Sequence, residues 1–110
     1  MNIKITTMRS INPYLNFNGN TEAAFNFYRS VLGGTFTVLQ RFKDVPESGK
    51  MSEDDGMKIM HITLTAPGII LMATDLLESF GHKLIPGNNY TININASSRE
   101  EATTLFNGLS

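Results

Sequence analysis

The sequence predicts an α+β fold in which a βαβββ module is followed by the start of a second copy that ends after its helix. Two observations support this prediction. Apolar residues recur at every second position in several short segments, as in half-covered strands, and at helical spacing in two others. In addition, residues 88–110 repeat the strand–turn–helix pattern of residues 11–34 at a constant shift of 77 positions, without a gap.

The first module opens with a strand and a helix. Residues 11–18 alternate between apolar and mostly polar side chains, which is typical of a strand covered on one face. A turn follows, and Asn20 or Thr21 can cap a helix. Gly33 and Gly34 end this helix, because glycine adopts the left-handed cap conformation without a steric penalty. The apolar stripe of the helix consists of Ala24, Phe25, Tyr28, Val31 and Leu32.

A second strand is predicted over residues 35–43, and a loop follows it. Residues 44–57 are acidic, contain proline and glycine, and offer few apolar anchors, so we expect a mobile surface loop there. One face of the strand would carry Phe36, Val38 and Phe42, and the opposite face Thr37, Leu39 and Arg41.

The third and fourth strands complete the module. Residues 58–66 predict a strand, and a turn at Pro67 and Gly68 leads into residues 69–75, an apolar run typical of a buried central strand. In the third strand, Met60, Ile62 and Leu64 would share one face, and His61, Thr63 and Thr65 the other.

The second copy begins after a linker at residues 76–88. Residues 90–95 predict a strand, with Ile92 and Ile94 on its apolar face. Ser98 and Glu101 form a capping-box pattern that opens a helix. We therefore expect a single domain at 1–110, with the first module at 9–75, the linker at 76–88 and the start of the second module at 89–110. The apolar stripe of the second helix is Ala102, Leu105, Phe106 and Leu109.

Four stretches together resemble the PhnB-like branch of the vicinal oxygen chelate superfamily, which includes glyoxalase I, bleomycin-resistance proteins and extradiol dioxygenases. They are INPYLNFNGNTEAAFNFYRSVLGG, RFKD, KIMHITL and ILMATD. The resemblance implies paired βαβββ modules whose sheets surround a cavity, commonly in a homodimer. Members usually continue for three more strands, so the second module would be truncated after its helix.

The resemblance also places the positions of possible metal ligands. Metal-dependent members carry histidine or glutamate where this chain has Asn12, Asn89 and, on the fourth strand, Leu71 or Met72. Amide oxygens are poor ligands for zinc or iron, and apolar side chains cannot replace a carboxylate. We therefore expect neither a metal centre nor a cofactor.

The polar strand faces would line one concave surface if the module folds as proposed. Arg41 beside amides and hydroxyls would suit an anionic or carbonyl-bearing ligand, although a solvated strand end is an equal alternative. His61 could act as an acid or base near neutral pH, or it could be a hydrogen-bonded histidine that orients its neighbours. The predicted ligand-binding residues are Asn12, Tyr14, Asn16, Thr37, Arg41, Thr63, Asn89 and Thr91.

Composition narrows the possible functions. The net charge is −1 and the nine basic residues are scattered, which argues against nucleic acid as a partner. No segment approaches the length of an apolar membrane span, and the absence of cysteine favours the cytoplasm. Our leading hypothesis is metal-independent binding of a small polar or anionic metabolite by a homodimer. The alternatives are a lyase- or isomerase-type enzyme that uses His61, and a metal-dependent glyoxalase- or dioxygenase-like enzyme.

Overall fold

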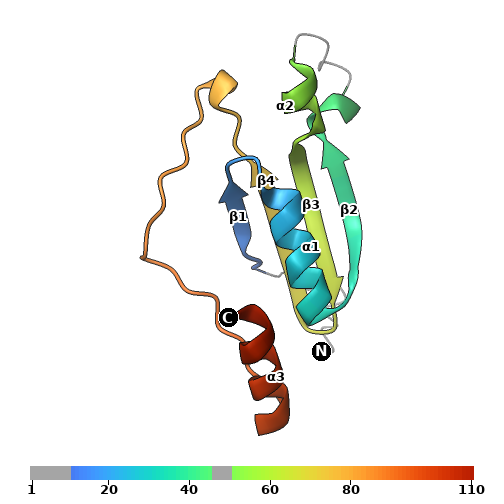
Figure 1. Cartoon of the computed structure of the whole chain (residues 1–110), viewed down its shortest axis with the longest axis vertical. Helices are drawn as coiled ribbons and strands as arrows, with labels where there is room; N and C mark the ends of the chain where they lie inside the picture. Colours follow the sequence, from blue (N-terminus) through green and yellow to red (C-terminus); the bar gives the residue numbers. More distant parts are fainter. Residues whose placement is uncertain (1–10, 46–50) are drawn as a thin grey trace, which may run out of the picture.

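The centre of the protein is a four-stranded sheet with one long helix, α1, on one of its faces (Figure 1). The computed structural model describes residues 11–45 and 51–110. The strand order is β1-β4-β3-β2, with β1 parallel to β4 and the other neighbours antiparallel. The predicted α+β class and the βαβββ order of the first module are confirmed. The elements are β1 (Tyr14–Phe17), α1 (Thr21–Leu32), β2 (Thr35–Arg41), α2 (Glu53–Met57), β3 (Ile59–Ala66), β4 (Ile69–Asp75) and α3 (Arg99–Leu109), with short 3-10 turns at Phe42–Asp44 and Glu78–Phe80.

The register of the strands separates the sheet into two faces. Residues that are paired across strands share a face, so Leu15, Ala73 and Ile62 form one row on the face that α1 covers. We call this side the helix face. Phe25 of α1 is fully buried against it, and burying such a side chain contributes roughly 1.5–3 kcal/mol. The buried core consists of Phe25, Ile59, Ile62, Leu64, Leu71 and Ala73.

The opposite side, which we call the open face, carries the alternate residues. Tyr14 pairs with Met72, and Met72 pairs with Thr63, so these three form a row across β1, β4 and β3. His61 lies two residues before Thr63 and is paired with Gln40 of β2. The alternation predicted from the sequence is therefore confirmed for β1 and for residues 61–65 of β3, whereas Met60 is not paired in the register and Ile59 is buried in the core.

Strand β2 departs from simple alternation. Its register against β3 shifts between Phe36 and Val38, and again between Gln40 and Arg41. The first shift is a bulge in β2 with Thr37 as the extra residue, and it reverses the faces of the β2 residues that follow. At the second shift the extra residue is Met60 of β3, so Gln40 and Arg41 still alternate. Leu39 consequently pairs with Ile62 on the helix face, and Val38 joins the open face, so the faces predicted for both residues are wrong.

The loop predicted at residues 44–57 is partly wrong, because residues 53–57 form α2. The hydroxyl of Ser52 caps this helix by accepting a hydrogen bond of 3.1 Å from the backbone nitrogen of Asp55. Acidic residues occupy its first turn, where the helix dipole favours negative charge. Residues 46–50, which also belong to the predicted loop, lie outside the described residues.

The chain beyond β4 runs away from the sheet and returns as α3 (Figure 1). The strand predicted over residues 90–95 is wrong: within the described part of the chain no strand pairs with this segment, and a strand needs a neighbour for its backbone groups. Helix α3 begins where the capping pattern predicted, with Ser98 accepting from the backbone nitrogen of Glu101 at 3.1 Å. The radius of gyration of 16.9 Å exceeds the roughly 13 Å of a compact domain this long. The reason is that α3 is not packed into the core, since none of its own residues is buried.

Asp75, at the end of β4, connects the start of α1 with the sheet. One carboxylate oxygen accepts hydrogen bonds from the backbone nitrogens of Gly19 and Thr21, both at 3.0 Å, and from the Thr21 hydroxyl at 2.6 Å. The other oxygen accepts from the backbone nitrogen of Ile59 at 2.8 Å. The cap expected from Asn20 is absent, since its side chain makes no cap hydrogen bond. A carboxylate distant in sequence satisfies the first turn of α1 instead.

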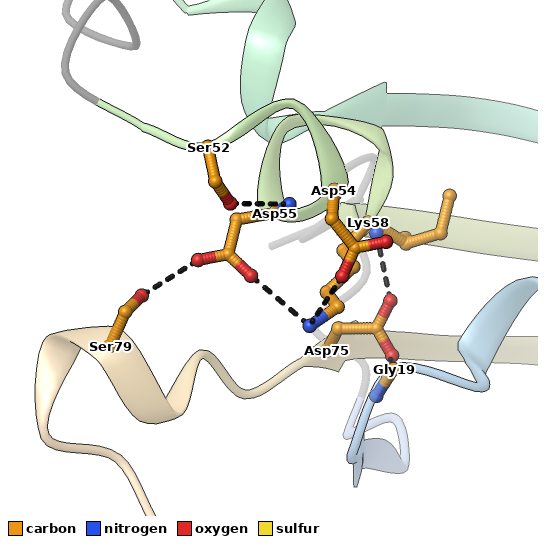
Figure 2. Close-up of polar contacts among 8 residues, drawn as sticks. Gly19, Ser52, Asp54, Asp55, Lys58, Asp75 and Ser79 are labelled. Carbon is orange, nitrogen blue, oxygen red and sulfur yellow. Dashed lines mark hydrogen bonds and ion pairs between the residues drawn. The ribbon is translucent and has the colours of Figure 1, made fainter.

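A second carboxylate, Asp55, links α2 to the 3-10 turn at Glu78–Phe80, which follows β4 (Figure 2). It accepts from the Lys58 ammonium at 3.1 Å and from the Ser79 hydroxyl at 2.8 Å. These hydrogen bonds, with that from Ser79 the larger cause, lower the pKa of Asp55. The same view shows Asp75 in the sheet beneath α2, next to the turn that contains Gly19.

We predict that Asp75→Asn lowers the free energy of unfolding by about 2 kcal/mol or more, because it removes a charged acceptor and turns an amide donor toward buried donors. Urea denaturation of the full chain measures this change. Asp54→Asn is the matched control, because the Asp54 side chain is 91% exposed and its contact with Lys58 is long, at 3.8 Å. The prediction is wrong if the two variants unfold within about 0.5 kcal/mol of each other.

Candidate functional site

The open face brings Tyr14, His61 and Thr63 into one hydrogen-bonded chain. The Tyr14 hydroxyl lies 3.2 Å from Nδ1 of His61, and Nε2 of His61 lies 2.9 Å from the Thr63 hydroxyl. Tyr14 is 46% exposed, whereas Thr63 is 8% exposed. These hydrogen bonds therefore link the buried hydroxyl of Thr63, through the imidazole of His61, to the phenol of Tyr14 at the surface. Each of the three groups can donate or accept a hydrogen bond.

The strand register explains why these three side chains meet. Tyr14 lies at the edge of the sheet on β1, and its in-register partner Met72 is in turn the partner of Thr63. The tyrosine side chain is long enough to reach across β4 to the next row, where His61 lies, and the two rings are 5.6 Å apart. Three of the residues predicted from alternation are thus together on one surface.

Arg41 is on the helix face, which corrects its predicted place among the open-face residues. Its guanidinium binds Glu22 of α1 through two nitrogens, at 2.6 and 3.1 Å, and also donates to the backbone oxygen of Met57 at 2.7 Å. The bulge at Thr37 is the cause, because it reverses the faces of the β2 residues that follow it. The hydrogen bond to Arg41 lowers the pKa of Glu22, and the same bond raises the pKa of Arg41.

The other predicted ligand-binding residues are spread more widely. Asn16 is exposed on the open face opposite Thr74, and the Thr37 hydroxyl lies 2.9 Å from that of Thr65. Asn12 is half-buried just before β1. The remaining two, Asn89 and Thr91, are exposed in the segment between β4 and α3, so they do not lie on the sheet as predicted.

A groove of about 350 Å³ lies between β1 and the linker. Its walls are residues 13–16 on one side and residues 84–87, Tyr90 and Ile92 on the other. Tyr14 is part of this groove and also bonds His61, so the groove adjoins the hydrogen-bonded chain. Its volume is at the lower end of the range of small-molecule sites.

A second groove, of about 410 Å³, lies between α3 and the segment that precedes it. Apolar side chains dominate its walls, including Ile92 and Ile94, which are 45% and 44% exposed. Hydrogen-bonding side chains like those of the open face do not converge on it. The first groove is therefore the better candidate for a site that binds polar molecules.

The residues at the family's metal positions do not form a metal-binding set. Leu71 is buried in the core on the helix face, and Met72 lies on the open face between Tyr14 and Thr63. Within residues 11–45 and 51–110, no three or more histidine, cysteine, aspartate or glutamate side chains form a group that could hold a metal ion. Among the same residues, no helix has the length and apolarity needed to cross a bilayer.

The solved structures that resemble this chain include two that show its class. Protein PA1353 from Pseudomonas aeruginosa is 39% identical, with a TM-score of 0.75 over 93% of this chain and 72% of that chain. The PhnB protein from Bacillus cereus, which carries the name of a 3-demethylubiquinone-9 3-methyltransferase, is 25% identical, with a TM-score of 0.53 over 92% of this chain and 73% of its own. No family model matches the sequence, and no curated protein does.

These likenesses define the class of the protein. The sheet with its single covering helix is that of a PhnB-like protein. More narrowly, the chain belongs to the family of PA1353, with which it shares more than a third of its residues over nearly its whole length.

We predict that Glu22→Gln destabilises the protein by about 0.5–1 kcal/mol at neutral pH, where the carboxylate is ionised and paired with Arg41. Because folding lowers the pKa of Glu22, this stabilisation is complete above the unfolded-state pKa. It disappears as the pH falls through the lower, folded-state pKa, so the wild type and the variant should converge in acid.

Urea denaturation at a series of pH values measures this difference. A double-mutant cycle with Arg41→Gln isolates the pair, since Arg41 also donates to Met57. A difference between wild type and Glu22→Gln that stays constant down to acid pH would contradict the prediction.

Proposed function

We propose that this chain binds a small polar metabolite without a metal ion, at the open face of the sheet beside Tyr14. The observation that carries the proposal is the hydrogen-bonded chain of Tyr14, His61 and Thr63 next to a groove of about 350 Å³. Partly buried polar side chains lower stability unless each of them is hydrogen-bonded, whereas apolar side chains on a purely structural face carry no such cost. Their convergence beside a groove supports a binding role.

We further propose that the chain is a member of the vicinal oxygen chelate superfamily, that it acts as a homodimer and that it resides in the cytoplasm. The βαβββ order and the repeat at 77 positions support the superfamily. The exposed apolar side chains of Ile92, Ile94 and Phe106 support association with another chain. The absence of cysteine supports the cytoplasm.

A second candidate function is acid–base catalysis by His61 in a lyase- or isomerase-type reaction. Both ring nitrogens have a hydroxyl partner, and the Tyr14 phenol could orient a substrate carbonyl. Arg41 is engaged with Glu22 on the other face. A comparison of pH–rate profiles for wild type and His61→Ala, on any substrate found, distinguishes catalysis from binding.

Neither metal-dependent chemistry nor methyl transfer gains support from the residues present. The amides of Asn12 and Asn89 and the thioether of Met72 are poor ligands for zinc or iron. The short Asn-Gly-Asn-Thr turn at 18–21 lacks the glycine-rich pattern of a Rossmann nucleotide site, so the methyltransferase name of the Bacillus cereus protein has no counterpart in this sequence.

We predict that the purified protein, after removal of any histidine tag, contains no stoichiometric zinc, nickel or iron. The reason is the donor set at Asn12, Asn89 and Met72, which offers no imidazole, thiolate or carboxylate. Elemental analysis of the protein before and after chelator treatment measures the content. One tightly held ion per chain that survives chelation would overturn the prediction.

We predict that small polar metabolites shift the backbone amide resonances of residues near Tyr14 and Thr63 in an NMR screen of the full chain. Thr63→Val should weaken the strongest ligand by about 2- to 10-fold, because one hydrogen bond is worth roughly 0.5–1.5 kcal/mol. Leu105→Ala, in the second groove, is the matched control and should leave the affinity unchanged. Ligands that shift only the resonances around α3 would refute the proposed site.

A further inference from the structure

We infer that protonated His61, rather than Arg41, supplies positive charge at the open face, and that His61 and Tyr14 together recognise the carboxylate of an otherwise apolar small molecule. This inference rests on the proposed binding site and specifies the class of its ligand. It follows from three features of the described residues: where the charged side chains lie, how the hydrogen bonds of His61 are arranged, and what lines the adjoining groove.

The charges of the sheet are confined to its helix face. Arg41 and Asp75 are the two arginine, lysine, aspartate or glutamate residues in strands β1 to β4. Arg41 is bound to Glu22 of α1, and Asp75 is buried against the first turn of the same helix. His61 is consequently the strand residue of the open face whose side chain carries a positive charge when it is protonated.

Among the described residues, the side chains that hydrogen-bond or pair with His61 carry no charge of their own. They are Tyr14 from β1, Gln40 from β2 and Thr63 from the same strand. A proton gained by His61 is therefore not neutralised by these neighbours. The resulting charge is available to a ligand, and an anion would stabilise it.

Protonation also fixes the direction of the hydrogen bonds. A neutral imidazole carries a hydrogen on one nitrogen, whereas an imidazolium donates from both. Protonated His61 must therefore donate from Nδ1 to the Tyr14 oxygen, 3.2 Å away, and from Nε2 to the Thr63 oxygen, 2.9 Å away. The Tyr14 hydroxyl hydrogen then points away from the ring of His61, and it becomes a donor for a ligand oxygen beside the positive charge.

The adjoining groove defines the rest of the ligand. Tyr14 lines it together with apolar side chains, of which Ile85 and Tyr90 are 81% and 66% exposed and Ile92 is 45% exposed. A volume of about 350 Å³ accommodates a single ring or a short alkyl chain. The ligand class is thus a monocarboxylate with an aromatic or short aliphatic body.

Benzoate and its neutral analogue benzamide test the inference on the full chain. Amide resonances of residues 13–16 and 90–92 report binding during titrations between pH 8 and pH 5.5. We expect the affinity for benzoate to rise at least about 5-fold as the pH falls, and that for benzamide to stay within about 2-fold. The rise corresponds to roughly 1 kcal/mol of added attraction, since 1.4 kcal/mol is a factor of ten.

Three variants separate the contributions of His61, Tyr14 and Arg41 to benzoate binding. His61→Gln should remove the pH dependence of benzoate binding. Tyr14→Phe should preserve this dependence and weaken benzoate about 2- to 10-fold, because it removes one hydrogen bond. Arg41→Gln is the control, and it should leave benzoate binding and its pH dependence unchanged. The amide spectrum of each variant verifies that it folds.

A measurement on the wild type gives an independent test. Benzoate should shift the midpoint of the His61 titration, followed by the imidazole ¹⁵N resonances, to higher pH, whereas benzamide should not. Pronounced pH dependence that survives in His61→Gln or vanishes in Arg41→Gln, or an unchanged midpoint despite bound benzoate, overturns the inference and leaves the binding site intact. If neither probe shifts the groove resonances at any pH, both the inference and the proposed site are wrong.

Discussion

The structure depends most on one buried carboxylate. Asp75 ends the central strand β4, and it accepts hydrogen bonds from the turn before α1, from the Thr21 side chain and from the first residue of β3. Removing such a group from water is costly unless all of its acceptor capacity is used, and here both oxygens have donors. The same contacts fix where α1 begins, and therefore which side of the sheet it covers. The opposite side, with His61, remains accessible as a consequence.

The sequence pattern predicts the faces of β1 and of residues 61–65 of β3 because hydrophobic alternation and burial act in the same direction there. It fails for Leu39 and Arg41, since the bulge at Thr37 of β2 reverses their faces and no glycine or proline marks it. It also fails for residues 90–95, whose alternation is strand-like although no neighbouring strand in the described chain supplies hydrogen bonds. Alternation describes what a strand would bury, and it does not describe what the strand would pair with.

The candidate site was predictable to the extent that it depends on alternation. Tyr14, His61 and Thr63 were assigned to polar faces, and the sheet register brings these faces together. Their hydrogen-bonded order was not predictable, because it depends on a side chain crossing an intervening strand. Asp75 was missed for a related reason: a carboxylate at the end of an apolar strand gives no sign of the distant backbone groups that it will bind.

The bulge at Thr37, between Phe36 and Val38, decides which surface of the sheet carries the charge of Arg41. If β2 ran without it, the guanidinium would move from the helix face to the open face, which also carries His61. One inserted or deleted residue in this strand could thus turn an uncharged surface into a cationic one, while the amino-acid composition barely changed. Relatives that align an arginine with Arg41 can accordingly differ in the ligands they attract, and an alignment column alone cannot distinguish an arginine that stabilises the fold from one that faces a ligand.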